Sequence, residues 1–138
     1  IGMGFVGLPM AVAIASAKKN YNVIGFEKNN NYGIKVCKNI NNKIFPIQSE
    51  DKILKKKFIK SIKNKKFYAT TDLNQIEKCS TVLVSIGFDF HSKDSSKNII
   101  ELFKKLYSIL KNKTLLVVET TLPPGFSEKK ILPIINKN

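Results

Sequence analysis

The stretch that decides the fold is Ile1–Pro9, which reads IGMGFVGLP. It carries a G-x-G-x-x-G pattern at Gly2, Gly4 and Gly7. The apolar run Leu8–Ala17, which is rich in small residues, follows directly and predicts a helix. In a strand–turn–helix unit the first glycine permits the tight turn, the second lets backbone N–H groups approach a pyrophosphate, and the third lets the helix pack closely on the sheet. The helix N-terminus then offers unpaired N–H groups to the phosphates. The alternative is a glycine turn that only packs a helix against a strand.

The residue before this turn indicates a truncated strand, and the residues within the turn are expected to contact the cofactor. Only Ile1 stands where a strand of about five residues should lead into the turn. We therefore expect the chain to begin inside the first strand of a parallel sheet, as a fragment of a longer protein would. Phe5 and Val6 lie in the turn, and with the three glycines they are expected to bind the cofactor.

The end of the next predicted strand supports a dinucleotide. Asn22–Phe26 is a short apolar strand, and Glu27 ends it. A carboxylate about 20 residues after the glycine turn accepts hydrogen bonds from the adenosine ribose hydroxyls and repels a 2′-phosphate. This favours NAD over NADP as the cofactor, although the neighbouring Lys28 weakens the argument. The alternative for Glu27 is a solvated charge at the end of a strand.

The rest of the chain continues the alternation of strands and helices. Helices are predicted at 31–39, 49–63, 99–110 and 127–135, and strands at 67–71, 81–86 and 114–118. Asp72 is expected to cap a helical turn, and Ser127 to cap the last helix. The pattern predicts an α/β fold: a Rossmann-like, doubly wound parallel sheet with helices on both faces and a truncated first strand, forming one NAD-binding domain over residues 1–138.

Ligands of such sheets bind beyond the carboxyl ends of the strands. Three features fall there: the glycine turn, Ser85–Asp89 and Glu119–Gly125. Ser85 is expected to contact the cofactor. The polar loop 87–97 holds His91, which has no Cys, His or Glu partner at ligand spacing, so no metal site is expected.

The composition argues against several classes of protein. The net charge is +14, and all 24 basic residues are Lys. Specific base reading and bidentate phosphate binding favour Arg, so we expect a solvated basic surface and no specific nucleic acid, with a basic nucleic-acid-binding module as the alternative. No apolar run reaches the roughly 18 residues of a membrane span. Two cysteines are too few for a disulfide framework, so a cytoplasmic, reducing location is expected.

Four stretches together resemble the UDP-glucose/GDP-mannose dehydrogenase family, the nucleotide-sugar 6-dehydrogenases, in their NAD-binding N-terminal domain. They are Gly2–Pro9, Val23–Glu27, Tyr68–Asp72 and Glu119–Gly125, and they follow the family's order. The wording ETTLPPG of the last stretch is most similar to the branch that acts on UDP-N-acetylhexosamines. A related β-hydroxyacid dehydrogenase, which shares the glycine turn, is the alternative within the enzymes.

The resemblance implies a function beyond the residues themselves. Family members oxidise the C6 hydroxyl of a UDP-sugar, such as UDP-N-acetylglucosamine, UDP-N-acetylmannosamine or UDP-glucose, to the uronate in two NAD-dependent steps through a cysteine thioester. By position Thr121 matches the threonine that helps to hold the catalytic water, and Thr120 matches the residue that lies against the cofactor. Ordinary capping of a strand end is the alternative for both. The full-length protein is expected to be a homo-oligomer that serves polysaccharide biosynthesis.

Two departures from the family pattern limit that expectation. Gly87–Asp89 stands where the family usually has Pro-Thr-Pro, which places an extra carboxylate near the expected cofactor cleft. The family's catalytic cysteine lies beyond this chain, and Cys37 and Cys79 fall at the wrong places to replace it. We expect both to be small buried or half-buried residues, and the chain alone to be inactive.

Overall fold

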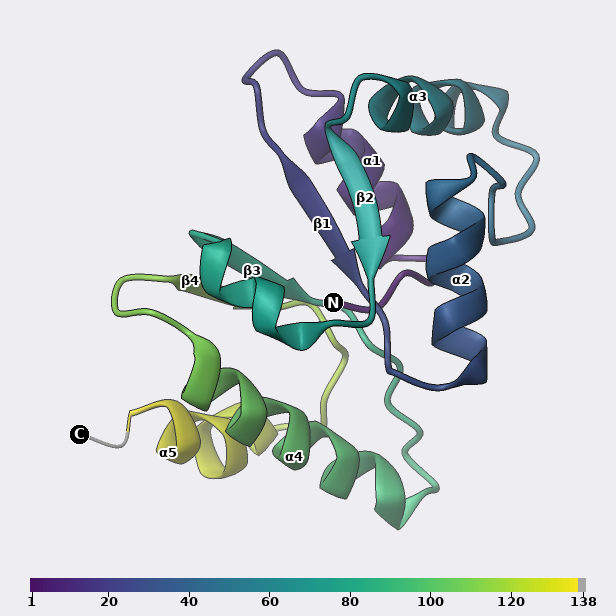
Figure 1. The fold of residues 1–138 in the computed structure, drawn as a ribbon. Coiled ribbons are helices and arrows are strands. Elements are labelled where there is room, and N and C mark those ends of the chain that lie inside the picture. The colour runs from purple at the N-terminus through teal and green to yellow at the C-terminus, as the bar shows by residue number, and fades with distance from the viewer. Residues whose placement is uncertain (137–138) are drawn as a thin grey trace.

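Helices and strands alternate along the computed structural model, which describes residues 1–136 apart from the side chain of Lys93 (Figure 1). The elements are α1 (Gly7–Ala15), β1 (Val23–Phe26), α2 (Asn31–Asn41), α3 (Lys52–Lys63), β2 (Phe67–Thr70), β3 (Thr81–Val84), α4 (Lys93–Ile109), β4 (Leu115–Val118) and α5 (Leu132–Ile135). A 3-10 helix (Leu73–Lys78) precedes β3, and a π-helical turn (Ser127–Ile131) precedes α5.

The four strands form two parallel pairs that meet at the N-terminus. In one pair β1 lies beside β2, from Val23 opposite Phe67 to Phe26 opposite Thr70, and in the other β3 lies beside β4. The main chain at the N-terminus joins the pairs, because the Gly2 N–H donates to the Phe26 carbonyl (2.8 Å) and the Ser85 N–H donates to the Ile1 carbonyl (2.9 Å). The order is therefore β2, β1, Ile1–Gly2, β3, β4, and the pairs diverge away from that junction (Figure 1).

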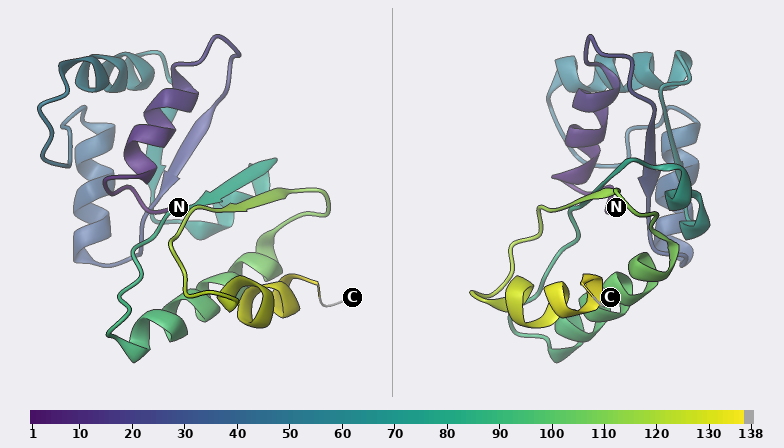
Figure 2. Two further views of the ribbon diagram at one scale, coloured as in Figure 1. Left: turned by 180° about the vertical axis from the view of Figure 1, so that it is seen from behind. Right: turned by 90° about the vertical axis from the view of Figure 1, so that its left-hand side faces the viewer.

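Two hydrophobic cores lie on opposite faces of these strands. One core gathers residues of α1, α2 and α3 around Phe67 and Ala69 of β2, and the other gathers residues of α4, the 3-10 helix and the π-helical turn around Phe26, Val82 and Val84. Figure 2 shows the same grouping, with α1, α2 and α3 around β1 and β2, and with α4 and α5 side by side near β3 and β4. The predicted parallel sheet with helices on both faces is confirmed.

Most predicted elements are present, and several of their boundaries differ: the helix predicted at 49–63 begins at Lys52, and the strand predicted at 81–86 ends at Val84. Helix α4 begins at Lys93, six residues before the predicted start at Ile99, and so takes in part of the loop predicted at 87–97. Asp94 in its first turn complements the positive end of the helix dipole, which favours this earlier start. Ser127 is the first residue of the π-helical turn rather than its cap, and the preceding residue makes no side-chain capping bond.

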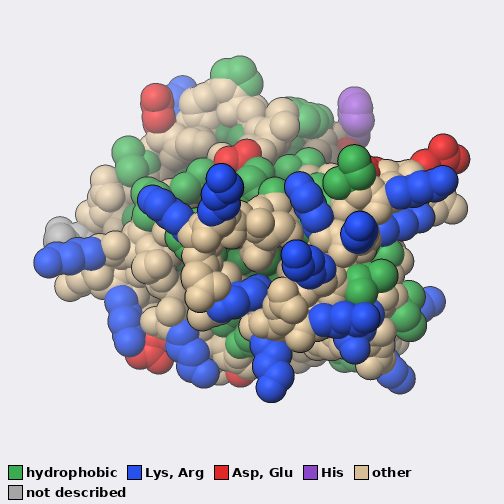
Figure 3. Space-filling model, turned by 90° about the horizontal axis from the view of Figure 1, so that it is seen from above, with side chains coloured by type: hydrophobic (Ala, Val, Ile, Leu, Met, Phe, Trp, Pro, Cys, Tyr) green, Lys and Arg blue, Asp and Glu red, His purple; other side chains and the backbone are tan. Residues whose placement is uncertain are grey.

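The lysines are spread over the surface. On the face shown in Figure 3 their side chains are scattered among hydrophobic and neutral groups rather than collected in one stripe. Helix α3 alone carries six of them on its length KILKKKFIKSIK, and its buried residues are only Phe58 and Ser61. In the part of the chain that the structure describes, no helix combines the length and the apolar character that a membrane span requires.

Candidate functional site

The glycine turn is held tightly between β1 and β3. Gly2 has a positive φ of 89°, and a Cβ there would lie 2.7 Å from the Ser85 carbonyl oxygen. A Cβ on Gly7 would overlap the Gly2 carbonyl oxygen and come within 2.5 Å of the Ser85 Oγ. A Cβ on Gly4 would meet nothing within 4 Å. The packing inside the domain therefore leaves no room for a side chain at Gly2 or Gly7, whereas it leaves room for one at Gly4.

The N-terminus of α1 opens onto this turn. At this end of α1 the Leu8 N–H donates to the Gly4 carbonyl (3.1 Å) and Pro9 has no N–H, while Val6, at the N-cap position, supplies no side-chain capping bond to the turn. Phe5 and Val6 are 74% and 54% exposed, so the backbone around them is accessible from outside. Exposed N–H groups at the positive end of a helix dipole form a binding site for an anion such as a pyrophosphate.

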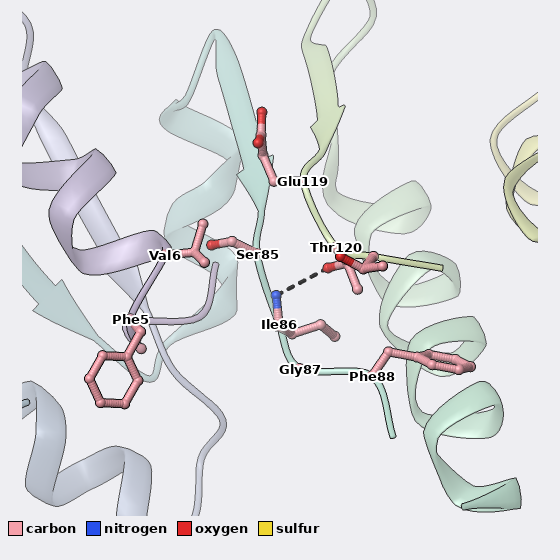
Figure 4. Close-up of a pocket in the computed structure, with 10 residues that line it drawn as sticks. Phe5, Val6, Ser85, Ile86, Gly87, Phe88, Glu119 and Thr120 are labelled. Atoms are coloured by element: carbon pink, nitrogen blue, oxygen red, sulfur yellow. Dashed lines mark hydrogen bonds between the residues drawn. The ribbon is translucent and has the colours of Figure 1, made fainter. Parts of the chain in front are cut away.

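A cavity of about 420 Å³ lies beyond the carboxyl ends of β3 and β4, beside this turn (Figure 4). Its walls come from three segments that are distant in the sequence: the glycine turn, the loop after β3 and the loop after β4. The residues that line it are Gly4, Phe5, Val6, Ser85, Ile86, Gly87, Phe88, Glu119, Thr120 and Thr121. The structure thus brings together the three features that the sequence placed at the carboxyl ends of the strands.

Ser85 ties the glycine turn to β3. Its hydroxyl donates to the Ile1 carbonyl (3.1 Å), with a longer contact to the Gly2 carbonyl (3.4 Å). In Figure 4 the side chain points from the end of β3 toward Val6 at the start of α1. Ser85 therefore shapes the cavity while its hydrogen is already engaged by the main chain of the turn.

Thr120 joins the two loops that follow β3 and β4. Its Oγ1 accepts a hydrogen bond from the Ile86 N–H (3.2 Å, dashed in Figure 4) and donates to the Val84 carbonyl (3.4 Å). These are the bonds of a side chain that caps a strand end, which was the alternative interpretation of this residue. Thr121, the next residue, is exposed on the cavity wall.

Sequence reasoning assigned no role to four of the lining residues, which are Ile86, Gly87, Phe88 and Glu119. Glu119 is an exposed carboxylate at the end of β4, and Phe88 forms part of the opposite wall. Phe88 is held by edge-to-face contacts with Phe90 and Phe126, at ring-centroid distances of 5.1 and 5.7 Å. The position of Glu119 directly after an apolar strand was a usable signal, whereas the contacts of Phe88 depend in part on a residue far along the chain, Phe126.

The extra carboxylate at Asp89 does not reach the cavity, contrary to expectation. Asp89 is exposed, its N–H donates to the Ser95 Oγ (3.0 Å), and its carboxylate accepts from the His91 N–H (2.9 Å). These bonds turn the loop toward α4, so Phe88 and not Asp89 faces the site. Among the described residues no group of three or more His, Cys, Asp or Glu side chains is placed to hold a metal ion.

Glu27 lies behind the glycine turn rather than in the cavity wall. Its Oε1 accepts a hydrogen bond from the Met3 N–H (2.5 Å), and its Oε2 makes a long contact with the Lys28 N–H (3.4 Å). The bond to Met3 fixes the carboxylate beside the turn, while Oε2 has at most a weak partner. Gly2 and Gly7, both buried, also shape the turn without lining the cavity.

The two thiols lie outside this cavity. Cys37 is buried in α2, and Cys79 is half-buried just before β3. Burial raises the pKa of both thiols. A buried thiol of raised pKa is a poor nucleophile, so the expectation that both are packing residues agrees with their surroundings.

The sequence of this chain is similar to those of known proteins along its whole length. Residues 1–138 match the NAD binding domain of the UDP-glucose/GDP-mannose dehydrogenase family. Among curated relatives, Protein CapL of Staphylococcus aureus is 26% identical over 99% of this chain, and a UDP-N-acetyl-D-glucosamine 6-dehydrogenase of Pseudomonas aeruginosa is 24% identical over the same share. The chain spans 30% of the length of each.

Solved structures give the same result for the fold. An NDP-N-acetyl-D-galactosaminuronic acid dehydrogenase from Methanosarcina mazei Go1 superimposes with a TM-score of 0.86 and 28% identity, over 99% of this chain and 30% of that one. A GDP-mannose dehydrogenase from Pseudomonas aeruginosa, at 19% identity, superimposes with a TM-score of 0.80 over 97% of this chain and 30% of its own. Its likeness shows the fold alone. The chain belongs to the UDP-glucose/GDP-mannose dehydrogenase family, of which it is the NAD-binding domain.

Proposed function

We propose that this chain binds NAD for a protein that oxidises the C6 hydroxyl of a UDP-N-acetylhexosamine to the uronate. The name of one relative, the UDP-N-acetyl-D-glucosamine 6-dehydrogenase of Pseudomonas aeruginosa, supports the substrate class. Bound NAD would supply the hydride acceptor for each of the two oxidations. The nucleophilic cysteine that this chemistry uses would come from outside this chain, since Cys37 and Cys79 are removed from the cavity.

The observation that carries the proposal is the open space at Gly4 between two glycines that are sterically fixed. Gly2 and Gly7 hold the turn against β3, while the space at Gly4 leaves the N-terminus of α1 accessible. A pyrophosphate fits this arrangement, because the positive end of the helix dipole and the exposed main chain of the turn at Phe5 and Val6 both favour a negative charge there. Glu27 would meet the adenosine ribose through Oε2, while its Oε1 stays on the Met3 N–H.

The two threonines after β4 would then have different roles. Thr120 holds the loops after β3 and β4 at a fixed distance through its bonds to Ile86 and Val84, so it would position the wall against which the cofactor lies. Thr121, exposed on the same wall, would hold the water that releases the uronate. A hydroxyl can orient water without adding charge beside a hydride acceptor.

The wider setting is also a proposal. Two unpaired thiols support action in a reducing compartment such as the cytoplasm. The dispersed lysines support a solvated surface and no specific nucleic acid. We infer a homo-oligomer for the whole protein, and its place would be the supply of uronates for a polysaccharide.

The test is calorimetric titration of the chain with NAD and with NADP. Glu27→Ala is expected to raise the Kd for NAD about tenfold, because a charge-assisted hydrogen bond is worth about 1.5 kcal/mol or more. Glu101→Ala is the matched control, since Glu101 is exposed on α4 away from the site. Urea unfolding of each variant shows that it is folded. An unchanged Kd in a folded Glu27→Ala variant would overturn the ribose role.

A further inference from the structure

The cavity at the carboxyl ends of β3 and β4 has one charged side chain in its lining, the carboxylate of Glu119. The other nine lining residues are uncharged, so none of the lysines that the structure describes forms part of the wall. The chain as a whole carries a net charge of +14. The wall of the cavity is therefore opposite in sign to the protein that surrounds it.

The main chain of Glu119 is fixed by the ladder between β3 and β4. Its N–H donates to the Val84 carbonyl (2.8 Å), and the parallel register, with Val84 opposite Val118, sets Glu119 beside Ser85. Neighbouring residues of a strand point to opposite sides, so Glu119 lies on the Ser85 side of the loop and Thr120 on the other. In Figure 4 Glu119 lies above Ser85. The backbone thus fixes the point from which this carboxylate borders the cavity.

The Glu119 carboxylate has no partner of its own. Across residues 1–136 no salt bridge or hydrogen bond joins its side-chain oxygens to another residue. The hydroxyl of the neighbouring Ser85 gives its hydrogen to the Ile1 carbonyl (3.1 Å). Water solvates this exposed carboxylate as long as the cavity is open. A ligand that fills the cavity removes part of that water, so the charge of the ligand decides whether Glu119 attracts it.

The two ends of the cavity favour opposite charges. At the glycine turn the positive end of the α1 dipole favours an anion, which the proposed function assigns to the pyrophosphate. At the end of β4, Glu119 favours a cation. The oxidised dinucleotide carries both charges, since its pyrophosphate is anionic and its nicotinamide ring, at the reacting end, is positive. Thr121, which the proposed function places at that reacting end, follows Glu119 by two residues.

We propose that Glu119 makes this cavity select the oxidised cofactor, NAD⁺, over the reduced one, NADH, by attracting the positive charge of the nicotinamide ring. The inference rests on the proposed function, because it requires the ring to lie at the end of β4. Each oxidation delivers a hydride, which is one proton with two electrons, to the ring and so cancels its charge. The attraction to Glu119 then ends. In a reaction of two oxidations this favours the replacement of NADH by a second NAD⁺.

The test measures binding and not turnover. Calorimetry gives the Kd values of NAD⁺, NADH and ADP-ribose, which lacks the nicotinamide, for the parent chain and for Glu119→Gln, which removes the charge at constant size. We expect the ratio of the NADH Kd to the NAD⁺ Kd to fall about threefold to fivefold, through weaker NAD⁺ binding, while the Kd of ADP-ribose stays the same. Glu128→Gln, the same change at an exposed carboxylate outside the cavity lining, should leave the ratio unchanged.

Ionic strength gives an independent measurement. All three ligands contain the pyrophosphate, so its contacts cancel in the Kd ratio and the charge of the ring remains. Raising KCl from about 0.05 M to about 0.5 M screens this charge, and it should move the ratio of the parent chain toward that of Glu119→Gln. A purely steric role of Glu119 would not depend on salt in this way.

Several results would overturn the inference. One is an unchanged Kd ratio in a folded Glu119→Gln variant. Another is an equal loss of affinity for NAD⁺ and NADH, because Glu119 would then contact a part that both forms share. If urea unfolding shows that the variant is not folded, the salt series of the parent chain decides, and a constant ratio refutes the inference. A parent chain that binds none of the three ligands would overturn the proposed function itself, and with it the inference.

Discussion

Gly7 and Gly4 should respond in opposite ways to the same added methyl group. In Gly7→Ala the new Cβ overlaps the Gly2 carbonyl oxygen and comes within 2.5 Å of the Ser85 Oγ, and a backbone oxygen held by the β1–β3 junction cannot move aside. In Gly4→Ala the Cβ meets nothing within 4 Å, and no positive φ opposes the side chain. The two substitutions therefore separate the packing of α1 from the approach of a ligand to the turn.

The expected cost of Gly7→Ala follows from the overlap. To regain van der Waals distance α1 must move off the strands, which disturbs the buried Leu8 and Val12. Such overpacking costs about 3 kcal/mol, and the better helix propensity of Ala returns about 1 kcal/mol. We expect a net loss of about 2 kcal/mol, or a fall of about 8 °C in Tm for a domain of this size. Gly4→Ala should change the stability by less than about 1 kcal/mol.

The assays are urea unfolding followed by circular dichroism and titration with NAD. Gly4→Ala should unfold like the parent chain yet bind NAD at least about tenfold more weakly, since a methyl group intrudes where the pyrophosphate approaches. Gly7→Ala should lose stability. Equal stability of Gly7→Ala and the parent chain would refute the steric argument. Unchanged NAD affinity in Gly4→Ala would refute the assignment of the open space to the cofactor.

Three further outcomes are expected. Asn41→Ala should cost about 2 kcal/mol in urea unfolding, because the Asn41 amide both donates to the Ala69 carbonyl and accepts from the Ala69 N–H, each at 2.8 Å; a loss under about 0.5 kcal/mol would contradict it. Thr120→Val should cost about 1 kcal/mol and Thr120→Ser much less, since only the former strips Ile86 of its partner; equal losses would show that the hydroxyl is dispensable. With Ile1 as the free N-terminus, the pKa lowered to about 6 means that the unfolded chain binds more protons between pH 6 and 8, so stability should rise across that window by about 2 kcal/mol. Acetylation of the amino group should flatten the rise, and a pH profile that survives acetylation would assign it to another group.

Local patterns predicted much of this fold. The glycine turn with its apolar helix needed only nearest neighbours in the sequence, and Asp72 indeed caps the 3-10 helix through the Asn74 N–H (3.1 Å). The composition of the β-branched run Thr81–Val84 likewise predicted a strand, in which Val82 and Val84 are buried. Each of these features is decided within a few residues, so the sequence pattern carries the information.

Features that depend on distant contacts were beyond such patterns. The bond from the Met3 N–H to Glu27 and the two bonds of Asn41 join residues 24 and 28 positions apart. Phe88 took the place expected for Asp89 at the cavity because Phe126, from the loop after β4, packs against its ring. The hydrogen bonds of Asp89 with Ser95 and His91 hold this residue outside the cavity wall. The sequence Gly87–Asp89 does not indicate either partner.

The Asn41 amide has one more consequence, which concerns self-association. By engaging both main-chain groups of Ala69, it occupies the outer edge of β2, where a strand of a neighbouring molecule would otherwise add. The addition of a further strand to the sheet is therefore blocked at this point of β2.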